Sequence, residues 1–173
     1  SAATSTSEDR PAAAAWAASV CKNRADDVIT PAAGDYYGGV QADQRFFIDE
    51  NGPVPTPDGL EMTKNGWEYY PQSLGKAAAK TWELGEHTPL VVTENGLATD
   101  DDRQRIRYTT SALQALHEVM EGGADVRGYI HWSLLDNYEW GSYDPTFGLI
   151  AVNRTTFERQ PKPSLNWLGS IQR

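Results

Sequence analysis

Small and apolar side chains recur at helical spacing in three segments of the chain, which predicts three amphipathic helices. The first lies within residues 70–84, the second begins at the acidic cluster 100–102 and ends at Gly122, and the third lies within 162–171. The helix dipole favours acidic residues in the first turn, and glycine is common just after the last. The predicted buried faces are Leu74, Ala77, Ala78 and Thr81; Ile106, Thr109, Leu113, Leu116 and Met120; and Leu165, Leu168 and Ile171.

Apolar runs between these helices predict strands. The clearest, at residues 89–93, shows no alternation, which is the pattern of a strand buried on both faces. Further strands are predicted at 126–135 and 147–153, and a strand weakened by glycines at 35–41. Strands that alternate with helices pair in parallel, so the pattern predicts an α/β fold.

The N-terminal part carries weaker signals. We expect residues 1–8, rich in Ser, Thr and Ala, to be disordered, and a helix capped by Asp9 to run to about Asn23. Residues 49–59 contain turn residues throughout and predict a loop. Cys21 is the single cysteine, which excludes an internal disulfide, and we expect it to be buried.

Composition narrows the class of protein. The 173 residues, 39% hydrophobic and 23% charged, suit one globular domain, and no apolar run reaches the roughly 18 residues of a membrane helix. The start lacks the features of a signal peptide, so we expect a cytoplasmic protein. The net charge of −9 argues against nucleic acid. His87, His117 and His131 lack ligand spacing, so we expect neither a metal nor another cofactor.

A carboxylate follows directly on the strand predicted at 89–93. Functional groups gather at the carboxyl ends of parallel strands, so Glu94 is a candidate site residue. The alternative is a solvated loop carboxylate or a charge at the entry of the next helix. The same Glu-Asn-Gly tripeptide occurs at 50–52 among turn residues, where it predicts a turn without chemistry. The preceding strand, and not the tripeptide, therefore supplies the signal.

Aromatic and acidic residues also gather at the end of the strand predicted at 126–135. Trp132, Glu139 and Trp140 would supply a stacking surface, a bidentate acceptor and an indole N–H donor, which a sugar-binding site requires. For a tryptophan alone, burial in the core is the more common outcome. The grouping with an acid at a strand end favours a site.

Several motifs occur here in the order found in a known family. VVTENG and WSLLDNYEW, followed by FGL, resemble the family 1 glycoside hydrolases, the β-glucosidase and β-galactosidase group. GDYYGGVQ and MTKNGWEYYPQSL resemble the segments that precede the nucleophile strand in bacterial members. The resemblance extends over about residues 35–173, and the two long motifs make it specific.

The resemblance implies a (β/α)8 TIM barrel and retaining hydrolysis of β-glycosides. Glu94 matches the nucleophile that forms a covalent glycosyl-enzyme, and Asn95 beside it would help to orient the site. Trp132 matches the residue that stacks under the sugar ring. Glu139 and Trp140 match groups that bind its outer hydroxyls. The further substrate-binding matches are Phe147, at the rim of the pocket, and Gln41, on the strand before the nucleophile.

The second catalytic carboxyl of the family is absent from this sequence. A retaining glycosidase requires two carboxyl groups roughly 5 Å apart, and the family's Asn-Glu-Pro motif, which holds the acid, does not occur here. A (β/α)8 barrel typically requires about 250 residues. We therefore expect residues 9–173 to form a partial barrel of about the last three βα units. Either the chain is a truncated piece, which we favour, or it pairs with an N-terminal half-barrel or with itself.

One position departs from the family pattern. Two residues after the Asn or Gln that Gln41 resembles, the family has a tyrosine that donates a hydrogen bond to the nucleophile, and this chain has Asp43. An anion there would repel Glu94 and raise its pKa. The alternative is an Asp43 that faces solvent.

Three functions remain open from the sequence. The first is a β-glucosidase-like hydrolase that lacks activity without its N-terminal half. The second is a non-catalytic domain that binds a sugar or a partner through Trp132, Glu139 and Trp140. The third is a scaffold without a ligand. None of the three involves a nucleic acid or a membrane.

Overall fold

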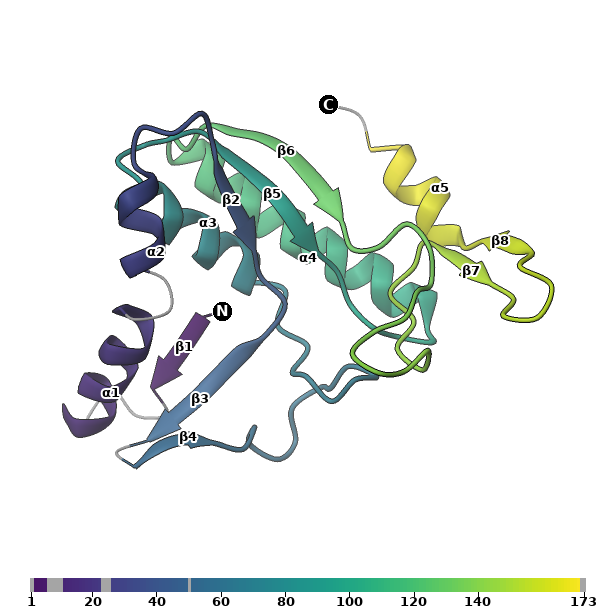
Figure 1. The fold of residues 1–173 in the computed structure, drawn as a ribbon, viewed down its shortest axis with the longest axis horizontal. Helices are drawn as coiled ribbons and strands as arrows, with labels where there is room; N and C mark the ends of the chain where they lie inside the picture. Colours follow the sequence, from purple (N-terminus) through teal and green to yellow (C-terminus); the bar gives the residue numbers. More distant parts are fainter. Residues whose placement is uncertain (1, 6–10, 23–25, 50, 172–173) are drawn as a thin grey trace.

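The computed structural model describes residues 2–5, 11–22, 26–49 and 51–171 (Figure 1). The part from β2 to β6 contains the predicted alternation of strands and helices. In chain order the elements are β1 (Ala2–Ser5), α1 (Pro11–Cys21), α2 (Asp27–Ile29), η2 (Thr30–Ala32), β2 (Gly38–Gln41), β3 (Arg45–Asp49), β4 (Gly52–Val54), α3 (Ser73–Leu84), β5 (Leu90–Asn95), α4 (Asp102–Glu121), β6 (Val126–His131), β7 (Ile150–Val152), β8 (Arg159–Pro161) and α5 (Pro163–Gly169).

A parallel sheet in the order β2-β5-β6 forms the centre of the fold (Figure 1). Its register places Val40 opposite Val92, and Val92 opposite Tyr129. Parallel neighbours require crossover connections, and α3 and α4 provide them. The predicted α/β architecture is confirmed, and the carboxyl ends of the three strands meet at one edge of the sheet.

The hydrophobic core lies between this sheet and the two helices α3 and α4 (Figure 1). Val40, Leu90 and Val92 of the strands are at most 2% exposed. The helices contribute Leu74, Ala78, Tyr108, Ala112 and Leu116. Burial of apolar surface is the main stabilising term in folding, so this layer holds the strand ends in place.

The helices follow the sequence pattern with local exceptions. Asp101 caps α4 by accepting a hydrogen bond from Arg103 N over 3.0 Å, and Gly122 follows the last turn. Met120 is 42% exposed, so the predicted buried face of α4 is wrong in the last turn of this helix. Ile171, predicted to be buried with α5, follows the helix and is also exposed. The buried members of the predicted faces are Leu74, Ala78 and Thr81 in α3, and Thr109 and Leu116 in α4.

Two predictions for the N-terminal part are wrong. The segment 1–8, expected to be disordered, contains β1, which pairs in parallel with β3. The loop expected at 49–59 contains β4, which pairs antiparallel with β3. Sequence reasoning missed β3 as well, because its short run with the buried Phe47 and Ile48 lies next to turn residues. Asp9, Asn23, Glu50 and the side chain of Cys21 lie outside the described residues.

The segment after β6 also differs from its prediction. β6 ends at His131, before the predicted limit at residue 135. The apolar run 147–153 contributes only β7, which pairs antiparallel with β8 and projects beside α5 (Figure 1). It is therefore not a further strand of the parallel sheet. Leu135 and Ile150 form one isolated bridge between the two regions.

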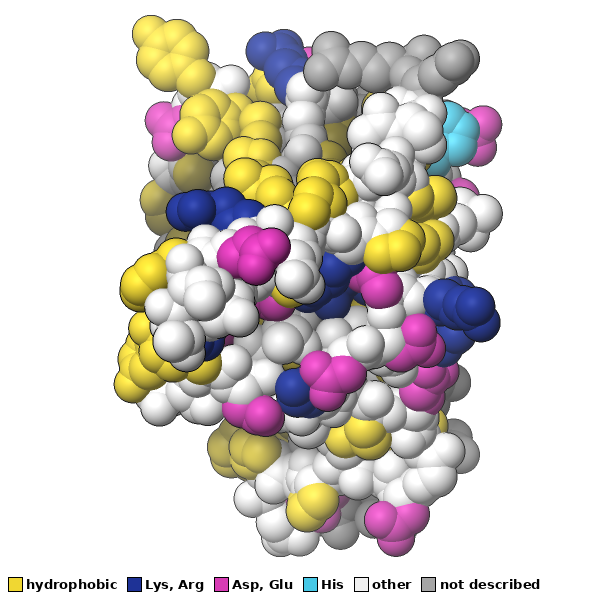
Figure 2. Space-filling model, turned by 90° about the vertical axis from the view of Figure 1, so that its right-hand side faces the viewer, with side chains coloured by type: hydrophobic (Ala, Val, Ile, Leu, Met, Phe, Trp, Pro, Cys, Tyr) yellow, Lys and Arg dark blue, Asp and Glu magenta, His cyan; other side chains and the backbone are white. Residues whose placement is uncertain are grey.

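The sheet remains open at both edges within the described residues, because β2 and β6 each pair only with β5. Ile130 on β6 is 56% exposed. On the face that carries α5 and the β7–β8 hairpin, hydrophobic side chains gather in the upper half, and most acidic side chains lie below them (Figure 2). No helix in the described parts of the chain is long and apolar enough to cross a membrane.

Candidate active site

Glu94 lies within β5, one residue before the strand ends, and its backbone pairs with Gln41 at the end of β2. A register shift between Val40 and Gln41 interrupts the ladder at this point. The Gln41 side chain donates a hydrogen bond from Nε2 to Glu94 Oε2 over 3.4 Å. Glu94 is therefore part of a strand and not a solvated loop residue, and two predicted site residues are in contact.

Asn95 connects the ends of all three strands. Its Nδ2 donates to the carbonyl oxygen of Ala42 over 2.8 Å, and its Oδ1 accepts from the Tyr129 hydroxyl over 3.1 Å. Its carbonyl oxygen accepts from Trp132 N over 2.9 Å. Asn95 is fully buried, and a buried amide with satisfied hydrogen bonds holds its surroundings rigidly. These contacts fix the backbone next to Glu94.

Trp132 and Glu139 form the second part of the site. The indole Nε1–H donates to Glu139 Oε1 over 3.0 Å, and Glu139 is buried. Two backbone hydrogen bonds with Ser142, of 2.7 and 3.0 Å, hold Glu139 in a tight turn. Burial first, and the charge of Glu139 second, raise the pKa of Glu94. Glu139 therefore lies within electrostatic reach of Glu94.

The structure does not bring Trp140 and Phe147 into this group. The Trp140 side chain is 96% exposed, because it follows Glu139 in the tight turn and projects outward. Phe147 is 4% exposed and packs against Trp67, with ring centroids 6.3 Å apart. Contacts of these two side chains with a sugar therefore stay predictions.

Asp43 is half-buried, and its Oδ1 is buried without a hydrogen-bond partner in the described structure. The alternative that Asp43 faces solvent is therefore wrong. Burial first, and the charge of Glu94 second, raise the pKa of Asp43 to about 7. The expected repulsion therefore raises the pKa of Asp43, whereas the pKa of Glu94 is raised by burial and by Glu139.

Sequence reasoning missed Arg105, which organises the loop after Glu94. Its side chain is 1% exposed and donates to Asp102 Oδ1 over 2.9 Å. Four backbone carbonyls, of Leu97, Thr99, Thr146 and Phe147, accept from the same guanidinium over 2.9 to 3.0 Å. Arg105 thereby joins the segment after β5 to the segment before β7. Its i,i+3 spacing from an aspartate was the available signal.

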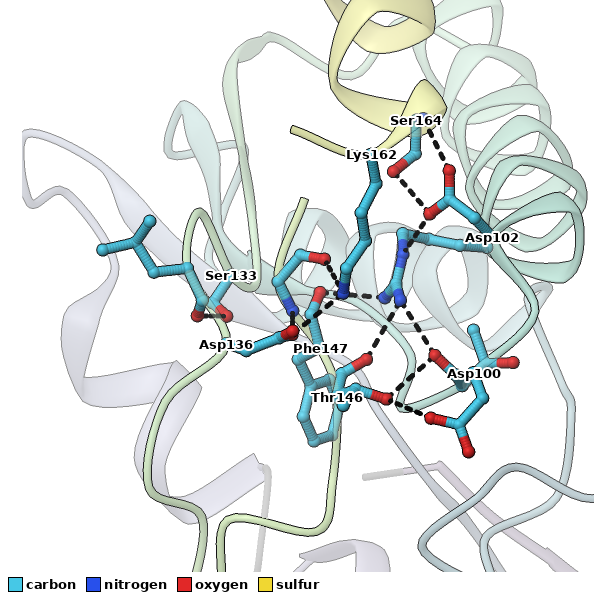
Figure 3. A network of polar contacts seen from close by, with 12 residues as sticks. Asp100, Asp102, Ser133, Asp136, Thr146, Phe147, Lys162 and Ser164 are labelled. Atoms are coloured by element: carbon cyan, nitrogen blue, oxygen red, sulfur yellow. Dashed lines mark hydrogen bonds and ion pairs between the residues drawn. The ribbon is translucent and has the colours of Figure 1, made fainter. Parts of the chain in front are cut away.

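Lys162 extends this network toward the segment that follows β6. Its Nζ donates to Asp136 Oδ1 over 3.0 Å and to the Gly148 carbonyl over 2.7 Å. Gly148 N donates to the same Asp136 oxygen over 2.8 Å. Asp102 in turn accepts from the backbone N and the hydroxyl of Ser164, each over 2.7 Å (Figure 3). These polar contacts position the irregular segment after β6 that carries Trp132 and Glu139.

The histidines have separate surroundings. Burial lowers the pKa of His131 to about 4, so it is neutral at pH 7. His87 stacks on Trp82 with ring centroids 4.8 Å apart, and His117 lies on the exposed side of α4. Within the ranges that the structure describes, no group of three or more His, Cys, Asp or Glu side chains is arranged to hold a metal ion.

Gly96 marks the closest approach between the ends of β5 and β6. A Cβ there would lie 1.7 Å from the Trp132 carbonyl oxygen, so a side chain requires a backbone shift. We expect Gly96→Ala to lower the free energy of unfolding by about 1–3 kcal/mol. Urea denaturation followed by tryptophan fluorescence measures this loss, and the fluorescence of the folded chain should also change. Gly169→Ala is the control, since its Cβ meets nothing within 4 Å. Equal unfolding midpoints of the two variants would contradict this close contact.

Fold and site together define a class of protein. A three-stranded parallel sheet with helical crossovers, and with carboxylates, an amide and an indole at the carboxyl ends of its strands, is consistent with part of a glycoside hydrolase barrel. The family model described as "Glycosyl hydrolase family 1" matches residues 37–173. The chain belongs to this family.

Relatives of known activity match part of the chain. A β-galactosidase of Saccharolobus solfataricus is 44% identical over 107 residues, which are 61% of this chain and 22% of the relative. β-Glucosidase 47 of Arabidopsis thaliana is 46% identical over 117 residues, 64% of this chain and 21% of the relative. The crystal structure of β-glycosidase BGL167 superposes with a TM-score of 0.87 at 38% identity, covering 96% of this chain and 39% of its own. The chain thus spans about a fifth of these curated relatives.

Proposed function

We propose that the chain carries the nucleophile half of the active site of a retaining β-glycoside hydrolase. The observation that supports this most directly is the contact between Gln41 and Glu94 at the carboxyl end of β5, beside the Trp132–Glu139 pair. A carboxylate, a neutral donor and an indole face suit the anomeric carbon, the hydroxyls and the apolar face of a sugar. The relatives named above are β-galactosidases and β-glucosidases, which favours the same class of substrate.

In this proposal Glu94 is the nucleophile. Its carboxylate oxygen bonds to the anomeric carbon of a β-glycoside while the bond to the leaving oxygen breaks and an acid protonates that oxygen. Water then hydrolyses the glycosyl ester and regenerates the carboxylate. Because burial and Glu139 raise the pKa of Glu94, the reactive ionised form is lost at a higher pH than for an ordinary glutamate as the solution is acidified.

Trp132 and Glu139 bind the sugar ring. The hydrogen bond between them holds the indole in one orientation, so that its face can stack on a pyranose. Glu139 uses Oε1 in this bond, which leaves its second oxygen for a sugar hydroxyl. We propose that Trp140 adds its indole N–H to this group when the rest of a barrel covers the turn, and that Phe147 shapes the rim of the pocket.

The general acid comes from outside this sequence, which contains no Asn-Glu-Pro. We propose that residues 9–173 correspond to the last three βα units of a (β/α)8 barrel. The open edges at β2 and β6, and the 39% coverage of the related structure, support this. In this proposal an N-terminal half-barrel, on a longer chain or on a separate one, pairs with the open edges. The open edges also permit self-association of this chain.

One observation favours a second function, a non-catalytic domain that binds a sugar or a partner. The Trp132–Glu139 pair is complete within this chain and offers a stacking face and an acceptor without the acid. Two results together would favour this function over the first: glucose quenches the tryptophan fluorescence of the chain, and a completed barrel does not hydrolyse β-glucosides.

The chain alone is expected not to hydrolyse an aryl β-glucoside, because no residue of this sequence matches the acid. A chimera of residues 37–173 with the part of β-glycosidase BGL167 that this chain does not match should hydrolyse it. An activated 2-deoxy-2-fluoro-β-glucoside should then attach one glycosyl group to Glu94, because the fluorine slows hydrolysis of the ester. Peptide mass spectrometry locates the label.

Glu50→Gln is the matched control, because it makes the same change in the other Glu-Asn-Gly tripeptide of the chain, at residues 50–52. This variant of the chimera should keep both hydrolysis and labelling. If the chain alone hydrolyses the substrate and Glu94→Gln abolishes this activity, the proposal that the chain carries only half of the active site is wrong. If the label attaches to another residue of the chimera, the assignment of Glu94 as the nucleophile is wrong.

A further inference from the structure

Three polar side chains, Asn95, Tyr129 and His131, are linked between the ends of β5 and β6. The Tyr129 hydroxyl oxygen lies 3.1 Å from Asn95 Oδ1, 3.3 Å from the Asn95 carbonyl oxygen and 3.3 Å from His131 Nδ1. The proposed function uses neither Tyr129 nor His131. The positions of their protons follow from which of these atoms can donate a hydrogen bond and which can only accept one.

Ala42 fixes the orientation of the Asn95 side-chain amide. The carbonyl oxygen of Ala42 can only accept, so the Asn95 atom that lies 2.8 Å from it is the donor Nδ2. The other amide atom, which faces Tyr129, is therefore the acceptor Oδ1. A flipped amide would instead place two oxygens against each other. Asn95 is fully buried, so neither atom can exchange its partner for bulk water.

The two acceptors of Asn95 determine the direction of the Tyr129 proton. A hydroxyl has one proton, and neither Asn95 Oδ1 nor the Asn95 carbonyl oxygen can donate, so Tyr129 donates to Asn95. The third neighbour of the hydroxyl is His131 Nδ1. A bare Nδ1 would face the hydroxyl oxygen lone pair to lone pair. His131 Nδ1 therefore carries a proton and donates it to Tyr129.

The second ring nitrogen of His131 agrees with this assignment. Nε2 is buried and has no hydrogen-bond partner within the described ranges. Arg105, a cation that acts on this ring, uses all five of its N–H groups on Asp102 and four backbone carbonyls. Burial first, and the charge of Arg105 second, lower the pKa of His131 to about 4, against an opposing effect of Asp102. The ring at pH 7 is therefore neutral, and its single proton is on Nδ1.

We infer that His131, as its Nδ1–H tautomer, donates to Tyr129, that Tyr129 donates to Asn95, and that this relay of hydrogen bonds positions the backbone beside Glu94. The inference rests on the proposed function only in treating Glu94 as the nucleophile. Asn95 follows Glu94 directly, and its carbonyl oxygen also accepts from Trp132 N over 2.9 Å. The relay therefore acts on both parts of the site, and Tyr129 and His131 are positioning residues that act through Asn95.

NMR of the whole chain with ¹⁵N-labelled histidine tests the positions of the protons. Long-range ¹H–¹⁵N correlation spectra distinguish a protonated ring nitrogen from a bare one, and the signals that vanish in His131→Asn belong to His131. At pH 7 its Nδ1 should be protonated and its Nε2 bare. Tyr129→Phe removes the acceptor of Nδ1, so the ring should shift toward the Nε2–H form that predominates in free histidine. His117, exposed on α4, is the control whose signals should not respond.

Two substitutions of His131 separate positioning from packing. Asparagine places an amide N–H near the position of Nδ1, and glutamine places one near Nε2, so only His131→Asn retains a donor for Tyr129. The backbone amide of Trp132, which donates to Asn95, reports the result. Its hydrogen exchange should stay slow in His131→Asn and become about tenfold faster in His131→Gln and Tyr129→Phe.

The chimera with β-glycosidase BGL167 provides a kinetic measurement. A nucleophile that is displaced slightly weakens the transition state more than it weakens sugar binding. Tyr129→Phe and His131→Gln should therefore lower kcat on an aryl β-glucoside by about tenfold, with a much smaller change in KM. His131→Asn should keep most of kcat, because it restores the donor without the ring.

Three results from the chain itself would overturn the inference: a proton on Nε2 at pH 7, a His131 tautomer that Tyr129→Phe leaves unchanged, or equal exchange rates of the Trp132 amide in His131→Asn and His131→Gln. The first is measured on the unsubstituted chain, so it decides the matter even if Tyr129→Phe does not fold. An active chimera whose kcat is the same in Tyr129→Phe would also overturn the positioning role. A chimera that does not hydrolyse β-glucosides would instead remove the proposed function and leave the relay in place.

Discussion

Arg105→Met should lower the free energy of unfolding of the chain by about 3–5 kcal/mol. The substitution keeps the length of the side chain and removes every donor of a guanidinium that is 1% exposed. Four backbone carbonyls lose a hydrogen bond. Those of Thr99, Thr146 and Phe147 each keep one other donor, whereas the carbonyl of Leu97 keeps none among the described residues. Asp102 keeps only its bonds with Ser164. An orphaned buried acceptor costs about 1–3 kcal/mol, and Asp102 also loses its charged partner, so the contact between the segments after β5 and before β7 should weaken to the direct hydrogen bonds between Thr99 and Thr146.

Urea denaturation followed by tryptophan fluorescence measures this loss, and the melting temperature should fall by roughly 10 °C. Arg107→Met is the matched control, because Arg107 lies on the same helix but is exposed and contacts Glu61 at the surface. Its unfolding midpoint should stay close to that of the unsubstituted chain. Similar midpoints for Arg105→Met and Arg107→Met would show that the buried network does not support the fold.

Glu94→Gln should lower kcat of the chimera on an aryl β-glucoside by about 10⁵-fold or more, as expected when a nucleophile is removed. The amide has the size of the carboxylate and can still contact Gln41, so sugar binding should change little. An amide oxygen lacks the charge needed to form the glycosyl ester. Steady-state kinetics should therefore show the loss in kcat, with a much smaller change in KM.

Glu94→Ala provides a complementary measurement. Removal of the side chain leaves space on the face of the sugar that the nucleophile attacks, and azide in solution can occupy it. Azide should restore turnover of an aryl β-glucoside with a good leaving group and yield the α-glucosyl azide, because attack occurs from that face. Full activity in Glu94→Gln, or a β-glucosyl azide from Glu94→Ala, would exclude Glu94 as the nucleophile.

Local signals were sufficient for the elements that position the site. β5 is an uninterrupted apolar run, and α4 has an acidic cap at Asp101 and Gly122 after its last turn, so short-range physics defines both. Parallel pairing follows from the alternation of strands and helices, and it brings Gln41 and Glu94 to one edge. The central sheet and the contact between these two residues were therefore predictable.

The N-terminal hairpin shows where local signals fail. β3 and β4 are short and lie among turn residues, and their strand conformation depends on pairing with each other and with β1. Pairing energy comes from partners that are distant along the chain, so periodicity within a short window cannot report it. The same holds for the run 147–153, of which β7 pairs with β8, a partner that lies outside the run.

The sequence by itself determined the family, the α/β order, and the presence of a carboxylate at a strand end beside an indole and a second acid. Only the tertiary structure decided that Trp132 meets Glu139 while Trp140 projects into solvent, that Arg105 is buried, and that burial raises the pKa of Asp43. Adjacent residues in a tight turn point in different directions, and the charge of an acid depends on burial and on neighbours from other strands. The direction of a side chain and the charge of a buried acid are therefore properties of the folded chain and not of any local stretch of sequence.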